Sequence, residues 1–416
     1  MNLRHRSSFI LLLTLLSLML LSPAASAQLP DWAIGPFTRP VYSHLDASTD
    51  APILKPNPQA VFHDPILDRE VHWQALHTFN PAAIVRHGQV YVLFRAEDES
   101  GSMQIGMHTS RLGLAVSRDG LHFRSLPAPV FTPAPDAQQS REWPGGVEDP
   151  RLIQAPDGRY ILTYTQWNRQ TYTIGVAASR DLRHWTKYGP ALGTAGPYAN
   201  LMYKSGGILT RLHHGHLVAV RLHGHFWMYW GEIHIRLAWS NDLIHWTPVE
   251  ESPVEEFSTQ AATQSAGDSV VRTGHALVLL NDRPGHFDSG FPEVGPPPIL
   301  TRHGIVLLYN GKNGATTISL SSPIANSNPP LRPVLAPGAY SVGEALFSAA
   351  NPAHLLARLD EPVLFPQQTW ERSGQYTAGT TFAEGLVLFH HHWFLYYGAA
   401  DSFVAVAIAP RQPSRP

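Results

Sequence analysis

Acidic side chains of this sequence recur beside proline, glycine or an aromatic ring, and the most unusual group is Gly146-Val147-Glu148-Asp149-Pro150-Arg151. Adjacent carboxylates are groups that general acid–base chemistry uses. Because successive side chains of a strand point to opposite faces, a strand through this segment would aim only one of Glu148 and Asp149 into a central cavity. The alternative is a turn in which Asp149 accepts hydrogen bonds from nearby backbone amides. Spacing alone leaves both interpretations open.

More polar residues stand where strands are expected to begin or end, and these are Asn80, Arg95, Glu232, Glu293 and Asp401. A cavity lined by carboxylates, Asn, Arg and aromatic rings is typical of a sugar site, since rings stack on the apolar faces of a pyranose while polar groups bind its hydroxyls. For a single residue, a salt bridge such as Arg95 with Glu97 or Asp98 is the simpler interpretation. For the whole set we favour a sugar site.

The elements that must position these residues are strands. Five apolar and aromatic runs of five residues each predict strands at 90–94, 160–164, 226–230, 305–309 and 393–397. Convincing amphipathic helices are nearly absent. The sequence therefore predicts an all-β fold.

A repeated Ser-x-Asp pattern suggests how the strands are organised. In three copies an aromatic ring follows the serine by six residues, and the copies are Ser117/Asp119/Phe123, Ser179/Asp181/Trp185 and Ser240/Asp242/Trp246. The serines are roughly 60 residues apart, a period that indicates a propeller or a solenoid. We expect each copy to be the outer hairpin of a four-stranded unit. With five aromatic runs, residues 59–410 are predicted to form a single five-bladed β-propeller with a central active-site cavity, rather than a pair of β-sandwiches or a right-handed β-helix.

Several motifs together resemble glycoside hydrolase family 130, the β-mannoside phosphorylases and β-mannosidases, from about residue 60 to residue 408. They are Phe79-Asn80-Pro81, Phe94-Arg95-Ala96-Glu97, Gly146 to Arg151, Gly295-Pro296-Pro297-Pro298-Ile299 and Tyr396-Tyr397-Gly398-Ala399-Ala400-Asp401. The resemblance implies a five-bladed propeller and an inverting attack on a non-reducing terminal β-mannoside. It implies that Asp149 is the general acid, which passes its proton through the mannose 3-hydroxyl. It also implies that the mannose pocket is lined by Asn80, Arg95, Glu148, Arg151 and Asp401, with less close matches at Lys204 and Tyr340.

The family divides over whether phosphate or water attacks the sugar. Its phosphorylases carry a Lys-Ile-Gly segment and a His-Arg-Pro segment, where this chain has Pro292-Glu293-Val294-Gly295 and Trp227 to Glu232. Phosphate needs clustered cations, whereas carboxylates repel it and can deprotonate a water. With residues 380–387, this arrangement is similar to the hydrolytic branch that cleaves β-1,2-mannosides. Glu232 and Glu293 are both candidates for the base, and an inverting acid–base pair should stand roughly 6.5–9.5 Å apart.

Composition and the start of the chain limit where the protein acts. The 416 residues carry a formal net charge of −2 with a pI near 6.9 and no cysteine, which argues against a nucleic-acid binder and excludes thiol chemistry. Arg4 and Arg6, the apolar run 9–21 and Ala25-Ser26-Ala27 predict a cleaved signal peptide at 1–27. The run is shorter than the ~20 residues of a membrane anchor. We expect an exported, periplasmic or secreted protein without membrane insertion after cleavage, and an extended lead-in at 28–58.

The 23 histidines include dense runs at 213–216, 223–225 and 390–392. Two contain glycine and all three occur in hairpin-like contexts, so we expect solvent-exposed or structural roles, with no catalytic metal and no cofactor. The His- and Gly-rich stretch 212–225 and a polar loop at 260–274 depart from the family pattern.

We therefore predict an exo-acting inverting β-mannosidase for β-mannoside oligosaccharides, most simply β-1,2-linked. The alternatives are a phosphorylase that makes mannose 1-phosphate and a non-catalytic sugar-binding propeller. The sequence predicts neither the natural substrate nor the oligomeric state.

Overall fold

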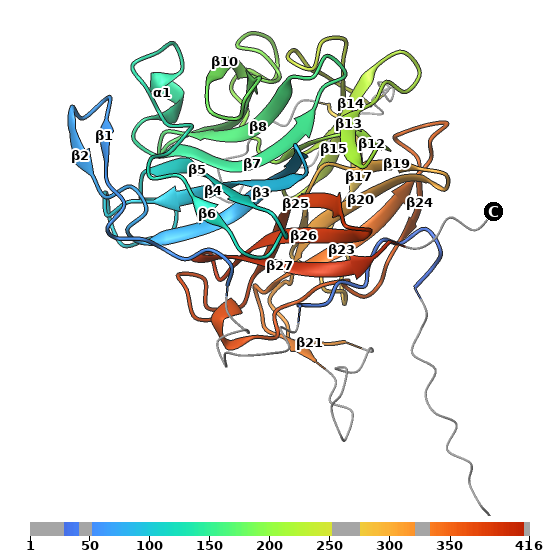
Figure 1. Cartoon of the computed structure of the whole chain (residues 1–416). Helices are drawn as coiled ribbons and strands as arrows, with labels where there is room; N and C mark the ends of the chain where they lie inside the picture. The colour runs from blue at the N-terminus through green and yellow to red at the C-terminus, as the bar shows by residue number, and fades with distance from the viewer. Residues whose placement is uncertain (1–28, 41–51, 252–274, 321–332, 412–416) are drawn as a thin grey trace, which may run out of the picture.

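The computed structural model describes residues 29–40, 52–251, 275–320 and 333–411 (Figure 1). The predicted signal peptide and the polar loop 260–274 lie outside these residues. In the described ranges the only helices are the short α1 (Gln139–Glu142) and the 3-10 helix η1 (Thr369–Glu371), so the expectation of an all-β fold is confirmed. The same ranges contain no helix of the length and apolarity that crossing a membrane requires.

Most strands fall into five antiparallel groups. The first contains β3 (His77–Arg86), β4 (Gln89–Glu97), β5 (Ser110–Ser117) and β6 (Arg124–Ser125), and the second contains β7 (Gly146–Gln154), β8 (Tyr160–Trp167), β9 (Tyr172–Ser179) and β10 (Trp185–Pro190). The third contains β11 (Gly206–Ile208), β14 (Phe226–Trp230), β15 (Ile235–Ser240), β16 (Thr247–Pro248) and β17 (Val278–Leu280). The fourth contains β18 (Phe291–Val294), β19 (Ile299–Thr301), β20 (Gly304–Lys312), β23 (Tyr340–Phe347) and β24 (Leu355–Arg358), and the fifth contains β25 (Thr381–Phe389), β26 (His392–Ala399) and β27 (Phe403–Pro410).

Three small hairpins complete the described strands. They are β1 (Phe62–Asp64) with β2 (Arg69–Val71), β12 (Thr210–His213) with β13 (His216–Ala219), and β21 (Ile318–Ser319) with β22 (Val334–Leu335).

The five predicted runs lie in β4, β8, β14, β20 and β26, which confirms all five strands. They read as nearly unbroken apolar stretches because both faces of these strands are buried. In β4, Val92 and Phe94 pack in one cluster with Tyr396 of the fifth group, while Leu93 packs in another with Leu162 of the second.

Neighbouring groups are joined in a cycle that returns to its start. Ser110 of the first group bridges Gly146 of the second, Thr163 Oγ1 donates to the Gly206 carbonyl (2.6 Å), and Val294 N donates to the Gly231 carbonyl (3.2 Å). Asn310 and Ala383 exchange two hydrogen bonds (2.8 and 3.0 Å), and Thr78 N donates to the Ser402 carbonyl (3.2 Å). The last contact joins the fifth group to the first, and Figure 1 accordingly shows β25 and β26 (red) beside β3 (blue).

The Ser-x-Asp repeat forms three equivalent turns. Asp119 Oδ1 accepts from the backbone N–H groups of Leu121 and His122, both at 2.9 Å, and Asp181 and Asp242 do the same two and three residues further on. Each turn follows the third strand of its group, so the residues of the repeat are structural.

The N-terminal segment is fastened to the fourth and fifth groups. Glu344 of β23 accepts hydrogen bonds from Ile34 N and Gly35 N, both at 2.8 Å, and burial raises the pKa of Glu344 to about 7. Thr38 and Leu54 form isolated bridges to β27. The exact limits of the lead-in and of the catalytic domain stay predictions.

Candidate active site

A cavity of about 370 Å³ receives side chains from all five strand groups. Nine of the ten predicted site residues line it: Asn80, Arg95, Glu148, Asp149, Lys204, Glu232, Glu293, Tyr340 and Asp401. Residues that are more than 300 positions apart in the chain therefore share one pocket.

Two β-bulges place Asn80 and Asp149 in the cavity. The β3–β4 register shifts between Phe79 and Pro81, and the β7–β8 register shifts between Glu148 and Arg151. Asn80 (φ 45°) and Asp149 (φ 47°) adopt the left-handed conformation, which Asn and Asp tolerate better than most residues. The proline that follows each has no N–H for the ladder, which a bulge accommodates.

These bulges correct the expectation drawn from strand alternation. Asn80 and Asp149 lie inside strands, neither before one nor in a free turn. Glu148 and Asp149 both line the cavity, because the bulge at Asp149 interrupts the alternation that would aim them apart. Glu293 likewise lies within the short strand β18.

The Arg95 guanidinium holds three carboxylates on one side of the cavity. Its Nη1 donates to Asp149 Oδ1 (3.0 Å), and its Nη2 donates to Glu148 Oε1 (2.7 Å) and Glu97 Oε1 (2.6 Å). Asn80 Nδ2 donates to the same Asp149 oxygen at 2.7 Å. The salt bridge of Arg95 with Glu97 and the sugar-site interpretation are therefore both realised.

Lys204 is the second centre of charge. Its Nζ lies 3.3 Å from Glu293 Oε1, 3.5 Å from Glu232 Oε2 and 3.7 Å from Asp149 Oδ2. Because both candidate bases and Asp149 contact the same ammonium, one carboxylate oxygen of each base lies at most about 7 Å from an oxygen of Asp149, which places all three carboxyl groups within reach of one sugar ring.

Glu232 and Glu293 are neighbours because they face each other in an antiparallel bridge, where side chains leave the same face. Like charges at such positions repel, and Lys204 offsets that repulsion. Glu232 accepts from Tyr172 OH (2.6 Å) and its side chain is 19% exposed, whereas Glu293 accepts from Ser205 Oγ (2.5 Å) and its side chain is 1% exposed. Glu293 Oε2 has no hydrogen-bond partner among the described residues.

The two adjacent carboxyls of β7 titrate in opposite directions. Burial raises the pKa of Glu148 to about 7. The positive charge of Arg95 opposes this shift, and the negative charges of Asp149 and Glu97 add to it. Burial would also raise the pKa of Asp149, but the charges of Arg95 and Lys204 outweigh it and lower that pKa. In the free protein Asp149 is therefore ionised at neutral pH, and Glu148 is the carboxyl of the pair that can carry a proton.

The pKa values of Asp401 and Lys204 also depart from their usual range. Burial raises the pKa of Asp401 to about 7; the positive charge of Arg95 opposes this shift and the negative charge of Asp149 adds to it. Burial would lower the pKa of Lys204, but the carboxylates of Glu232, Glu293 and Asp149 outweigh it and raise that pKa, so the ammonium stays charged.

Arg151, the tenth predicted residue, is not among the side chains that line the cavity. Arg151 is buried behind the cavity, and its guanidinium donates to the carbonyls of Asp149 (2.9 Å), Val294 (2.7 Å) and Gly295 (3.3 Å). Its Nη1 also lies 3.0 Å from Glu384 Oε1. The β7–β8 register shifts between Glu148 and Arg151, and the contacts of Arg151 hold the backbone around Asp149.

Sequence reasoning missed several lining residues, among them Trp167, Tyr172, Lys312, Tyr376 and Phe382. Lys312 ends β20, and polar residues at the ends of strong strands were the signal used for Arg95 and Asp401. The Lys312 ammonium lies over the rings of Phe291 (5.1 Å) and Tyr340 (5.4 Å) and forms no ion pair within 4.0 Å in the described ranges.

The histidine runs lie where the sequence suggested. His213 and His214 lie at the β12–β13 turn, and His390 and His391 lie between β25 and β26. His223 lies in the short turn between Leu222 and His225, which form an isolated bridge. All of these histidines except His225 are exposed.

A cavity rich in carboxylates and rings at the meeting point of five strand groups is typical of a glycoside-active enzyme. The chain belongs to glycoside hydrolase family 130, since the family model described as β-1,4-mannooligosaccharide phosphorylase matches residues 52–412. The expectation of family membership is confirmed.

Known relatives fall on both sides of the family. A 1,2-β-oligomannan phosphorylase of Thermoanaerobacter sp. (strain X514) is 28% identical over 88% of this chain and 96% of its own length. A solved structure described with the family's glycoside hydrolases that target β-1,2 mannosidic linkages in Candida mannan is 42% identical, covers 94% of this chain and 97% of that chain, and superposes with a TM-score of 0.79. A glycosyl hydrolase from Bacteroides ovatus is 43% identical with the same coverage and TM-score.

Proposed function

We propose that this protein is an exo-acting β-mannosidase that hydrolyses terminal β-1,2-mannosides with inversion. The observation that carries the proposal is the charge around the space that the nucleophile would occupy. Glu232 and Glu293 both face it, and the ammonium of Lys204 is shared among them and Asp149. A cation already held by three carboxylates has little attraction left for phosphate.

The relatives support a β-1,2 linkage from two directions. The curated phosphorylases are named for 1,2-β-oligomannan and β-1,2-mannobiose, and the more similar solved structure is described with hydrolases of β-1,2 linkages. Its 42% identity, against 28% for the phosphorylase, favours water as the nucleophile.

A phosphorylase is the second candidate, and Lys312 favours it. This ammonium lines the cavity without a carboxylate within 4.0 Å in the described ranges, so a phosphate could approach it. We give it second place because the carboxylates of the cavity outnumber its cations.

Glu232 is the better candidate for the base that activates water. A base must be ionised and reachable by the water that it deprotonates. The side chain of Glu232 remains 19% exposed, whereas burial outweighs the charge of Lys204 and raises the pKa of the enclosed Glu293. Glu293 then positions Lys204 and the floor of the site.

Asp149 acts as the acid only if it is protonated. In the protein without a sugar, the charges of Arg95 and Lys204 lower its pKa, so it is ionised at neutral pH. We propose that Glu148 and Asp149, joined through Arg95, carry one proton as a pair at neutral pH. Sugar binding shifts this proton to Asp149, from which it passes through the 3-hydroxyl to the departing oxygen while water forms the new bond to the anomeric carbon. The base takes the proton of the water, so the charges balance.

The cyclic order of the five strand groups supports a further part of the proposal, a closed five-bladed β-propeller. Residues 1–27 carry the pattern of a signal peptide, so we also propose that the protein is exported and acts in the periplasm or outside the cell.

The experiment compares wild type with Asp149→Asn in phosphate-free buffer on β-1,2- and β-1,4-mannobiose. We expect wild type to release mannose from the β-1,2 substrate. Asp149→Asn should lose at least about 100-fold in kcat while still binding the disaccharide in calorimetry. Asp157→Asn, on an exposed turn, is the control.

Retained turnover in Asp149→Asn would show that another group is the acid. Binding without cleavage of either linkage by wild type would instead identify a sugar-binding protein.

A further inference from the structure

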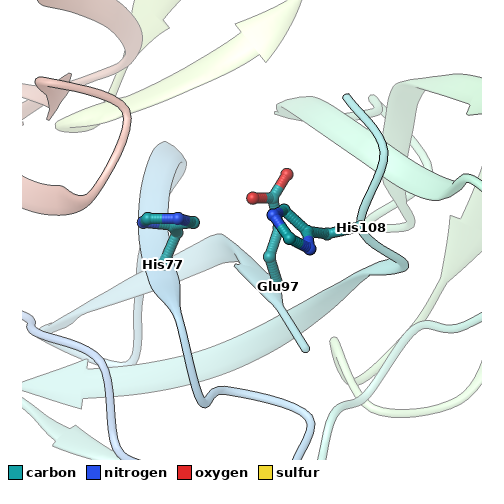
Figure 2. A group of neighbouring side chains, drawn as sticks. All are labelled: His77, Glu97 and His108. Carbon is teal, nitrogen blue, oxygen red and sulfur yellow. The ribbon is translucent and has the colours of Figure 1, made fainter. Parts of the chain in front are cut away.

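Two histidines and a glutamate gather beside the cavity that holds Asp149, and of the three only Glu97 is tied to that cavity, through Arg95. His77 begins β3 and Glu97 ends β4, and the two are direct partners in the strand register, so their side chains leave the same face. His108 comes from the segment that leads back to β5. Potential ligand atoms of the three residues all lie within 4.8 Å of one another (Figure 2).

Hydrogen bonds orient both imidazoles for metal binding. His108 Nδ1 donates to the Ser100 carbonyl (2.8 Å), and because a carbonyl only accepts, the neutral ring keeps its lone pair on Nε2. His77 Nδ1 bonds Ser402 Oγ at 2.9 Å, and because a hydroxyl accepts as well as donates, the ring can take the tautomer that leaves Nε2 free for a metal. Outer partners of this kind fix the ring orientation in metal sites.

Glu97 supplies a buried carboxylate with one oxygen that is only weakly held. Its Oε1 accepts from Arg95 at 2.6 Å, while its Oε2 accepts a longer bond, 3.2 Å, from the neutral amide of Gln375. Arg95 is shared with Glu148 and Asp149, so the neighbourhood carries more negative than positive charge. An added divalent cation is electrostatically favoured there.

We propose that His77, Glu97 and His108 form a binding site for a divalent transition metal of the Zn²⁺ class. Two imidazole nitrogens and a carboxylate oxygen are ligands that Zn²⁺ takes, with water in the remaining position. Bonds of about 2.0–2.1 Å require ligand atoms roughly 3.3 Å apart, so the side chains must close slightly around the ion.

The metal has a route to this group. A second cavity, of about 480 Å³, is lined by His77, His108, Gln375 and Ser402, and it is distinct from the one that holds Asp149. It can supply both the ion and the water ligand. Metal binding by these three side chains requires neither a bound sugar nor the hydrolysis of one, so it can be tested independently of the proposed function.

The test is a titration of the metal-free full-length protein with Zn²⁺ alone, in competition with a chromophoric chelator. We expect one site per chain, with affinity reduced at least about 100-fold in His77→Ala and His108→Ala, the upper end of what losing an outer partner costs. Co²⁺ loading should give a visible absorption band that both variants lose.

Matched controls separate this site from the exposed histidines. His72 makes a similar Nδ1 contact, to the Pro58 carbonyl at 2.7 Å, but is exposed, so His72→Ala should bind as wild type does. The triple variant His390→Ala, His391→Ala, His392→Ala should also retain the site. If the alanine variants do not fold, His108→Gln keeps an N–H donor for Ser100 without offering a ring nitrogen. Unchanged Zn²⁺ affinity in the His77 and His108 variants, or its loss in the triple variant, would overturn the proposal.

Discussion

At the scale of single residues, two cations organise the carboxylates of the cavity. Arg95 holds Glu148 and Asp149, and Lys204 reaches across from Asp149 to Glu232 and Glu293. Because these cations stabilise ionised Asp149, the proton that the reaction needs must be held by a neighbour. We proposed Glu148 as that neighbour, because burial raises its pKa to about 7 and Arg95 joins it to Asp149.

This arrangement predicts a pH dependence with a definite sign. A group that must be protonated and whose pKa is about 7 is active below that pH, so kcat/KM should fall as the pH rises through about 7. Glu148→Gln removes the carboxyl group that holds the proton. We expect kcat/KM of this variant to be at least about 10-fold lower than that of wild type at pH 6–7, and its pH profile to lack the fall near pH 7. A pH profile of kcat/KM from 4 to 9 measures both.

Asp401→Asn is the matched comparison, since burial raises the pKa of Asp401 to about 7 as well, but in the described ranges Asp401, unlike Glu148, shares no side-chain hydrogen bond with the Arg95 that holds Asp149. If the fall of kcat/KM near pH 7 disappears in Asp401→Asn but persists in Glu148→Gln, the proton-sharing role of Glu148 is contradicted.

Single substitutions also test whether Glu232 or Glu293 is the base. We expect Glu232→Ala to lose about 100- to 10,000-fold in kcat on an activated β-mannoside with a good leaving group. Azide should restore turnover and yield the α-mannosyl azide, since the deleted side chain leaves room for a small anion that needs no base.

Glu293→Ala, its partner across the same bridge, should lose less and gain nothing from azide. The opposite pattern would assign the base to Glu293.

At the scale of elements, bulges decide which side chains reach the cavity. The strand runs are visible in the sequence because their two buried faces demand nearly continuous apolar residues. The bulges at Asn80 and Asp149 are not visible in the same way, since an Asn-Pro or Asp-Pro pair also suits a turn. This is why the sequence placed Asn80 at a strand end and left Asp149 open between a strand and a turn, whereas Arg151 was grouped with the pocket by the family resemblance.

Close packing of β26 on β3 gives a prediction for Gly398. A Cβ at this position would lie 2.2 Å from Asn80 Oδ1 and 2.9 Å from Asn80 N. We expect Gly398→Ala to destabilise the fold by roughly 1–3 kcal/mol through overpacking and to lower kcat by displacing Asn80 from Asp149. Urea unfolding and steady-state kinetics test the two effects.

A double-mutant cycle with Asn80→Ala identifies the clash, because the second change removes Oδ1 and should recover part of the lost stability. Simple additivity of the two stability changes would show that the alanine collides elsewhere.

At the scale of the whole molecule, the site exists because the strand groups meet in a cycle. Short local patterns were sufficient to name nine lining residues: family motifs for Asn80, Arg95, Glu148, Asp149 and Asp401, departures from the phosphorylase segments for Glu232 and Glu293, and less close matches for Lys204 and Tyr340. Trp167, Tyr172 and Lys312 were missed because their role depends on where β8, β9 and β20 end relative to the other groups, which no local pattern specifies. The group of His77, Glu97 and His108 was missed for the same reason.

In the proposed function, the charge of the whole cavity favours water over phosphate as the nucleophile. Five carboxyl groups line it, those of Glu148, Asp149, Glu232, Glu293 and Asp401, beside the three cations Arg95, Lys204 and Lys312, and burial raises the pKa of Glu148, Glu293 and Asp401. Two of these cations are already paired with carboxylates. Such a cavity should bind a neutral sugar and a water far better than it binds a sugar and a phosphate.

The most direct measurement follows β-1,2-mannobiose by proton NMR in the presence and absence of inorganic phosphate. We predict that the first-formed product is α-mannose at a rate that phosphate does not increase, with no mannose 1-phosphate. Mannose 1-phosphate that forms only when phosphate is added would contradict hydrolysis, and β-mannose as the first product would contradict inversion.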